Sequence, residues 1–357
     1  MPSLTPNIIE LLPDWWCFRD WHSIHESTVS LSCTLIAKKP ISSDAIRCRV
    51  NGKLVQFLLT DPPDSSRKNF WFLPDDHISG IEIKYQIPPE SLESLLEIET
   101  TFDSGLRSFP FIQIHDWNNR HPVPPSTNIE RVSGAGATAY NYFCNGASDY
   151  LRFSRVAAHH GVDPLSRASR VLDWGAGCAR LTRWFIDKGE AEVTGVDVDA
   201  DNIAWCVENI PRAEFQTVGL YPPTELESKS FDLIFGNSVL THLTQPTMKL
   251  WLAELRSLMK PNGIALLSFH GNFSNAYFCS HSLGAVERIL KNGFYDEQIG
   301  KEMVGFLSDP TYYRQTFMSD AHALTVFDEA GFEVVDVIVG YVSRCQNLAV
   351  LRYKNKS

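Results

Sequence analysis

The sequence predicts an α/β protein in which an all-β domain precedes a doubly wound, mainly parallel sheet. Three observations lead to this prediction. Short runs of alternating apolar and polar residues fill the region from 28 to 115, whereas apolar strands alternate with helical patterns from Arg170 onward. A polar stretch with several prolines separates the two regions. At 357 residues the chain is long enough for two domains.

The composition narrows the classes of function. Hydrophobic residues make up 44% of the chain, as in packed globular proteins, and the formal net charge of -10 opposes a large nucleic-acid interface. No apolar run reaches membrane-spanning length and we see no signal peptide, so we expect a cytoplasmic protein without membrane insertion. The 8 cysteines form no C-x-x-C pair, which argues against a metal site and indicates reduced, mostly buried thiols.

Residues 1–115 are predicted to form a β-sandwich-like accessory domain. Asn51-Gly52 lies between two alternating runs, which is a strong signal for a β-hairpin. Strands are expected at residues 29–35, 46–50, 54–59, 69–73, 80–87, 95–102 and 109–115, and a short helix at 8–12. The domain shows no cluster of catalytic residue types. We therefore expect a scaffold, with glycan binding, partner binding or homo-oligomerisation as alternatives.

Residues 116–127 are predicted to be a linker, and residues 128–357 the second domain. A helical lead-in is expected at residues 140–158. The first strand of the sheet then ends at Asp173, and Gly175 and Gly177 follow before a helical pattern begins. Such glycines allow a sharp turn on which a ligand can lie directly.

The spacing of this turn excludes two common nucleotide sites. A dinucleotide fingerprint needs a third glycine where this chain has Arg180, and a P-loop needs a Gly-Lys-Ser/Thr sequence that is absent. A second apolar strand ends in another acid, Asp197, about one strand–helix–strand unit after Asp173. A carboxylate there can accept hydrogen bonds from both hydroxyls of a ribose. The pattern therefore predicts a nucleoside without a pyrophosphate.

These residues resemble the class I S-adenosylmethionine-dependent methyltransferases. The first motif of that family is similar to residues 171–177 and the second ends at an acid such as Asp197, while residues 230–243, 258–268 and 331–335 are similar to its later strands and turns. The resemblance covers roughly residues 130–357. It implies a doubly wound seven-stranded methyltransferase sheet, S-adenosyl-L-methionine as cofactor, and cofactor contacts at Asp173, Gly175, Ala176, Gly177, Asp197, Val198, Gly219, Leu220 and Asn237.

Three further features belong to this resemblance. Ala179 stands where the family usually has a glycine, and we expect a slightly tighter turn rather than lost binding. Residues 271–320, which are rich in aromatic side chains, fall where the family often inserts a cover over the acceptor. The segment 346–353 resembles the last, antiparallel strand.

Methyl transfer to a hydroxyl benefits from a general base, for which histidine is well suited. His242 and His270 follow two predicted strands at the edge where open α/β sheets bind ligands. His270 is the first candidate for the base and His242 the second. For each, the alternative is a structural histidine bonded to the backbone.

The sequence thus predicts a methyltransferase that acts on a small molecule or glycan, with O-methylation as the expected reaction. The phrase Ser268-Phe269-His270-Gly271 and the terminal strand look similar to methyltransferases associated with glycan assembly. The alternative is a non-catalytic binding or scaffolding protein on the same fold, motivated by Ala179. A nicotinamide-dependent oxidoreductase is a more distant alternative, against which Arg180 argues.

Overall fold

The computed structural model describes residues 12–25, 27–87, 91, 93–101, 108–114, 121–278 and 283–354, with only the backbone of residues 21, 283 and 284. Three parts of the predictions therefore lie outside the described residues: most of the helix predicted at 8–12, residues 115–120 of the predicted strand and linker, and Cys279. Each of the described cysteines is buried with a free thiol. Within the described ranges, no helix is both long enough and apolar enough to span a membrane.

The N-terminal part contains two four-stranded antiparallel sheets. One has the order β1-β2-β6-β5 and comprises Trp15–His25 (β1), Thr28–Ala37 (β2), Ile78–Gln86 (β6) and Phe57–Thr60 (β5). The other has the order β4-β3-β7-β8 and comprises Lys53–Val55 (β4), Ile46–Val50 (β3), Glu93–Thr100 (β7) and Ser108–Ile114 (β8). Their apolar side chains share one core, in which Trp15 and Phe109 meet with ring centroids 4.9 Å apart.

One predicted element of this part is confirmed and two are wrong. The hairpin at Asn51-Gly52 is present, and both residues have positive φ, 49° and 79°. The strand predicted at 54–59 is wrong as a single element, because it divides at Gln56 into β4 and β5, which join different sheets. The strand predicted at 69–73 is also wrong: Asp64–Asn69 is a helix (α2) and a turn follows.

The C-terminal part is a seven-stranded mixed sheet with the order β11-β10-β9-β12-β13-β17-β16. The first five strands in this order are parallel, whereas β17 runs antiparallel to both of its neighbours. The predicted doubly wound seven-stranded sheet is therefore confirmed. The strands are Glu214–Thr217 (β11), Glu192–Asp197 (β10), Arg170–Trp174 (β9), Phe231–Gly236 (β12), Met259–Phe269 (β13), Gln346–Tyr353 (β17) and Phe332–Val342 (β16).

Alternate residues of the central strands point to opposite faces of this sheet and form two cores. In β9, Val171 packs with the core on the side of α5 (Ala139–His159) and α6 (Thr182–Lys188). Leu172 packs with the core on the side of α8 (Gln245–Leu258) and α11 (Asp320–Glu329). The helices of this part are Ser126–Ser133 (α4), Ala139–His159 (α5), Thr182–Lys188 (α6), Ala200–Asn209 (α7), Gln245–Leu258 (α8) and Asp320–Glu329 (α11), with a short 3-10 helix at Leu240–His242 (η3).

The segment between β13 and α11 contains two helices and a hairpin, Asn272–Phe278 (α9), Leu283–Asn292 (α10), Phe294–Ile299 (β14) and Arg314–Met318 (β15). The hairpin is held at the end of β13, because the N–H of Met318 donates to the carbonyl oxygen of His270 at 3.0 Å. This segment corresponds to the insertion that the sequence suggested.

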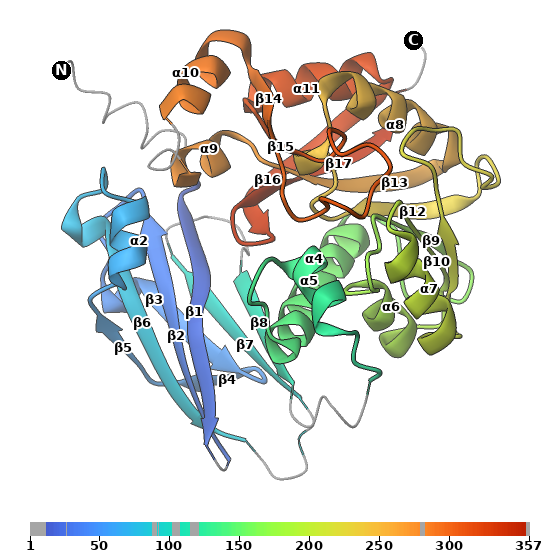
Figure 1. The fold of residues 1–357 in the computed structure, drawn as a ribbon. Coiled ribbons are helices and arrows are strands. Elements are labelled where there is room, and N and C mark those ends of the chain that lie inside the picture. The colour runs from blue at the N-terminus through green and yellow to red at the C-terminus, as the bar shows by residue number, and fades with distance from the viewer. Residues whose placement is uncertain are drawn as a thin grey trace.

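The two parts of the chain share one continuous apolar core. Trp16 of β1 contacts the rings of Phe273 and Tyr277, and its indole N–H donates to the carbonyl oxygen of Arg344 at 2.7 Å. In Figure 1 the N-terminal strands, in blue, stand beside α4 and α5 in green and below α9. The N-terminal sheets are therefore packed against the larger sheet through aromatic side chains.

Candidate functional site

The turn after β9 is fixed by glycines in the left-handed region. Gly175 has a φ of 82° and Gly177 a φ of 52°, values that other residues rarely adopt. A Cβ at Gly175 would also come within 2.3 Å of Val239, and one at Gly177 within 2.5 Å of Val132. Both positions thus require glycine for backbone conformation and for packing.

Ala179 has the same backbone conformation as these glycines. Its φ is 62°, its side chain is buried, and its N–H donates to the carbonyl oxygen of Ala176 at 2.9 Å. A left-handed alanine is strained by roughly 1–2 kcal/mol, which explains why glycine suits the position. The alanine nevertheless makes this backbone hydrogen bond within the turn, and the expectation that ligand binding is retained stays a prediction.

Asp197 ends β10 and supports the glycine turn. One carboxylate oxygen accepts the N–H of Gly177 at 2.7 Å, and the other accepts the N–H of Asp199 at 2.8 Å. Burial raises the pKa of Asp197 to about 6. Each carboxylate oxygen has two acceptor positions, so both can still accept a hydrogen bond from a ligand hydroxyl.

Asp173 lies deeper than Asp197, at the end of β9. It is buried, and its carboxylate accepts the hydroxyl of Thr182 at 2.5 Å. Burial raises the pKa of Asp173 to about 7. The group is therefore poised between its neutral and charged forms near neutral pH.

An ion pair that the sequence did not reveal lies next to these acids. Asp199 caps the N-terminus of α7 by accepting the N–H groups of Asp201 and Asn202, both at 3.1 Å. Its second oxygen accepts Nε of Arg131, from α4, at 2.7 Å. Asp199 could have been recognised from sequence as a capping acid before a helical run. Its partner Arg131 lies 68 residues away, and no local pattern indicates the pairing.

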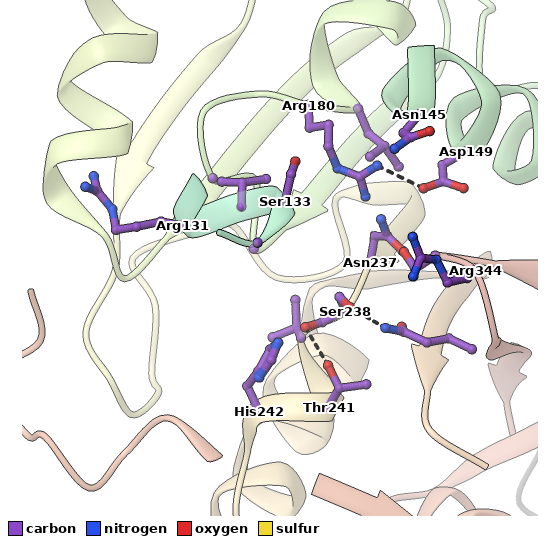
Figure 2. Close-up of a pocket in the computed structure, with 18 of the residues that line it drawn as sticks. Arg131, Ser133, Asn145, Asp149, Arg180, Asn237, Ser238, Thr241, His242 and Arg344 are labelled. Atoms are coloured by element: carbon purple, nitrogen blue, oxygen red, sulfur yellow. Dashed lines mark hydrogen bonds and ion pairs between the residues drawn. The ribbon is translucent and has the colours of Figure 1, made fainter. Parts of the chain in front are cut away.

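A cavity of about 790 Å³ opens beside the glycine turn. It brings together most of the residues predicted to form the site, namely Asp173, Gly175, Ala176, Gly177, Asp197, Val198, Asn237, His242 and His270. Gly219 and Leu220 do not line it, whereas the neighbouring Val218 does. The backbone carbonyl of Leu220 instead accepts the indole N–H of Trp251 at 3.1 Å. Figure 2 shows one side of this cavity, with Asn237, Ser238 and His242 at the ends of β12 and η3.

Asn237 and Ser238 follow β12 and are held by the turn before β17 and by β13. The side-chain oxygen of Asn237 accepts the hydroxyl of Ser343 at 2.8 Å, while its Nδ2 is buried and has no partner within the described part of the chain. The N–H of Ser238 donates to the hydroxyl of Ser268 at 2.6 Å, and Ser268 donates to the buried Gln346 at 2.7 Å. These bonds tie together the ends of β12, β13 and β17.

The two candidate histidines have similar surroundings. Nδ1 of His270 lies 3.1 Å from the carbonyl oxygen of Thr316, and its ring stacks on Phe317 with centroids 4.6 Å apart. Nδ1 of His242 lies 2.9 Å from the carbonyl oxygen of Arg314, and its ring stacks on Tyr313 at 3.9 Å. Both partners come from β15 or the residue before it, so the insertion fixes both rings.

These contacts determine where each histidine carries its proton. A carbonyl oxygen only accepts, so Nδ1 must donate and Nε2 keeps its lone pair. Burial lowers the pKa of His270 to about 3 and that of His242 to about 4. Both rings are therefore neutral at pH 7 and can accept a proton at Nε2.

The N-terminal part also lines the cavity, although no local pattern in the sequence predicts this. It contributes Cys17, Phe18, Arg19, Asp20 and His22 from β1, and Phe109 and Phe111 from β8. The insertion contributes Glu302, Met303, Tyr312 and Tyr313. The N-terminal part is therefore more than a separate scaffold, because it forms one wall of the site.

Comparison with known proteins gives the following similarities. Residues 171–263 match the model of a methyltransferase domain. The ubiquinone biosynthesis O-methyltransferase of Neisseria meningitidis is 23% identical over 191 residues, which are 52% of this chain and 71% of that protein. The malonyl-[acyl-carrier protein] O-methyltransferase of Halalkalibacterium halodurans is 28% identical over 193 residues, covering 50% of this chain and 68% of that protein.

Among solved structures, the chain is similar to the 1,6-didemethyltoxoflavin-N1-methyltransferase of Burkholderia thailandensis, crystallised with S-adenosylhomocysteine. The identity is 15%, the TM-score is 0.43, and the match covers 75% of this chain and 98% of that one.

The chemistry of the cavity fits S-adenosylmethionine, which carries a sulfonium, an ammonium group and a ribose diol. The carboxylates of Asp173, Asp197 and Glu302 line the cavity and suit the positive charges and the hydroxyls, whereas Asp199 is already paired with Arg131. The unpartnered Nδ2 of Asn237 can donate to a carboxylate or a ring nitrogen. The matched domain and these residues agree: the enzyme is an S-adenosylmethionine-dependent methyltransferase.

Proposed function

We propose that this enzyme methylates a hydroxyl group of a small molecule, with His270 as the general base. The observation that carries the proposal is the fixed tautomer of His270, whose Nδ1 meets the carbonyl oxygen of Thr316 and whose Nε2 is left to accept a proton. His242 has the same arrangement and is the second candidate. A sugar hydroxyl is one acceptor of this kind, so a glycan remains within the proposal.

For the cofactor, we propose that Asp197 accepts the ribose hydroxyls, as its unused acceptor positions support. Asp173, Asn237 and the backbone of the glycine turn would hold the methionine end, with Ala176 and Val198 packing against the nucleoside. Gly219 and Leu220 were predicted to contact adenine, and we now assign that contact to Val218, which lines the cavity. When bound, S-adenosylmethionine supplies an electrophilic methyl group.

The low basicity of His270 is compatible with this role. A hydroxyl becomes strongly acidic as its oxygen acquires a third bonding partner, the transferred methyl carbon, so a weak base can accept its proton at that stage. His270 would hold the proton at Nε2 while the bond to Thr316 keeps the ring in place. Most of the rate enhancement would then come from positioning the acceptor against the cofactor.

Two measurements test the proposal. Calorimetry with S-adenosylhomocysteine should give saturable binding, and turnover with a panel of hydroxylated small molecules and sugars should yield methyl ethers. An N-methylated product from an amine panel, with no ether formed, would refute O-methylation. Absence of S-adenosylhomocysteine binding by the folded protein would refute the assignment of the site.

A further inference from the structure

The cavity has a second charged region, made of four arginines that we call the arginine cluster: Arg19, Arg152, Arg180 and Arg344. Arg19 comes from β1, Arg152 from α5, Arg180 from the glycine turn and Arg344 from the turn between β16 and β17. In Figure 2, Arg180 and Arg344 lie on the side of Asn145 and Asp149, apart from Arg131. The arginine cluster is therefore distinct from the Arg131–Asp199 ion pair.

The arginine cluster is only partly balanced by carboxylates. Asp149 accepts Nη1 of Arg152 at 3.1 Å with one oxygen and Nη1 of Arg180 at 2.9 Å with the other. One negative charge is thus shared between two guanidinium groups. Both oxygens of Asp149 are engaged in this way, so the pair of arginines keeps an excess positive charge.

The other two arginines have no carboxylate within ion-pairing distance in the described part of the chain. Arg19 donates from Nη2 to the side-chain oxygen of Asn145 at 2.6 Å, and the guanidinium of Arg344 lies 5.9 Å from the ring of Phe18. The remaining nearby acid, Asp20, accepts the hydroxyl of Thr34 at 2.8 Å, and its burial raises its pKa to about 6, so it is mostly ionised at pH 7. Asp149 and Asp20 together supply two negative charges against four guanidinium groups, and the arginine cluster keeps an excess positive charge.

Buried donors of the arginine cluster also lack acceptors. Nη1 of Arg19 and Nε of Arg152 are both buried and have no hydrogen-bond partner in the described ranges. The Arg152 side chain is only 6% exposed and lines the cavity. A buried donor without an acceptor is unfavourable by about 1–3 kcal/mol, and more when it is charged, so such donors call for an acceptor at this place.

We infer that the arginine cluster binds an anionic group, a carboxylate or a phosphate, of the methyl acceptor. The inference rests on the proposed function, because it assigns the acceptor to the side of the cavity opposite the cofactor acids. Guanidinium groups bind both kinds of anion in a bidentate manner, which orients the acceptor as well as holding it. The cavity then has an acidic side for a cationic cofactor and a basic side for an anionic acceptor.

The test uses calorimetry with three probes, malonate, inorganic phosphate and the neutral malonamide. Arg19→Gln and Arg344→Gln remove the two arginines that lack carboxylate partners, and the Arg344 side chain is exposed, so that variant should fold. Arg155→Gln is the matched control. It removes the same charge from the same helix as Arg152, but Arg155 pairs with Glu97 at 2.8 Å and does not line the cavity.

We expect the wild-type enzyme to bind malonate or phosphate at least tenfold more tightly than malonamide. Each of Arg19→Gln and Arg344→Gln should weaken binding of the anion by about tenfold or more, and Arg155→Gln by less than twofold. The anion that binds more tightly identifies the acceptor group. Failure of both anions to bind, or unchanged binding in both cavity variants, would overturn the inference.

Binding of S-adenosylhomocysteine is measured on each of the same samples. Its affinity should be equal in all four proteins, because none of these arginines is assigned to the cofactor. If S-adenosylhomocysteine binds and the anions do not, the inference on the acceptor fails and the proposed function stands. If the anions bind and S-adenosylhomocysteine does not, the proposed function fails instead.

Discussion

The acidic and basic sides of the cavity are built from different kinds of chain segment. The acidic side comes largely from consecutive strand–turn–helix units, in which Asp173, the glycine turn and Asp197 follow one another closely along the chain. The basic side joins β1, α5 and the β16–β17 turn, and the hydrogen bond from Trp16 to Arg344 spans 328 residues of sequence. One side depends on local backbone conformation and the other on long-range packing.

This difference suggests that the two sides can be altered separately. A substitution on the acidic side should change cofactor affinity, whereas one at the histidines or the arginine cluster should change use of the acceptor. A variant that moved both properties together would show that the two sides are coupled.

The largest effect is expected for His270→Ala. If Nε2 of His270 accepts the proton, turnover per folded molecule should fall by about 10²–10⁴-fold, with unchanged affinity for S-adenosylhomocysteine. His159→Ala, an exposed histidine at the end of α5, is the control and should behave as wild type. Undiminished turnover in a stable His270→Ala protein would remove this residue from the reaction and leave His242 as the base.

Asp197→Ala should weaken binding of S-adenosylhomocysteine by about 1–3 kcal/mol, because hydrogen bonds to a charged group are lost. Asp201→Ala is a matched control, since that acid is exposed four residues further on. Calorimetry on both variants measures the difference. Wild-type affinity in Asp197→Ala would place the ribose elsewhere.

The pH dependence of binding sharpens the same comparison. The pKa of Asp197 is about 6 in the free enzyme, so protonation should weaken cofactor binding by about tenfold per pH unit below that value. The histidines, with pKa values of about 3 and 4, stay neutral over this range. Protonation of either histidine ring should therefore not lower turnover between pH 7 and 5 when the cofactor is saturating.

Asp173→Asn should stabilise the enzyme without cofactor at alkaline pH. Burial raises the pKa of Asp173 from 3.8 to about 7, so the native state retains a proton that the unfolded state releases. The contribution of the protonated Asp173 side chain to the free energy of unfolding is fully present below about pH 4 and is lost as the pH rises through about 7. Thermal or denaturant unfolding at pH 8 should show a gain of roughly 1–3 kcal/mol for the variant. An equal or lower stability at pH 8 would mean that Asp173 is already well accommodated as an anion.

The smallest effect is expected for Ala179→Gly. Relief of roughly 1–2 kcal/mol of left-handed strain is offset by the entropy of glycine and by the loss of a buried methyl group. The free energy of unfolding should change by less than about 1 kcal/mol, and cofactor affinity should not change. A tenfold gain in affinity would show that alanine distorts the turn.

The parts of the molecule that could be predicted are those with local signals. Asp173, Gly175, Gly177 and Asp197 were found because strand ends and positive-φ turns leave short, recognisable patterns. Asn51-Gly52 was correct for the same reason. The seven-stranded sheet and its antiparallel last strand were predicted from the family resemblance rather than from any single pattern.

The rest depended on tertiary contacts. The pattern of residues 54–59 predicts one strand, but the chain passes from one sheet to the other at Gln56. That division depends on the tertiary contacts of each half and leaves no pattern in the sequence. The start of β1 was not predicted as a strand, because the side chains of residues 15–18 are all buried and do not alternate between apolar and polar. The pairing of Arg131 with Asp199 and the approach of Arg19 to α5 left no trace in local spacing.

The hydrogen bond between Trp16 and Arg344 also has a consequence for biosynthesis. At about 5–20 residues per second, the ribosome needs roughly 16–66 s to make the intervening 328 residues. For most of that time, until Phe273 and Tyr277 have been made, Trp16 and Phe70 lack the rings that cover them in the folded protein. The aromatic surface of the nascent N-terminal part is thus exposed to chaperones and to aggregation until these rings leave the ribosome, and the hydrogen bond to Arg344 can form only later.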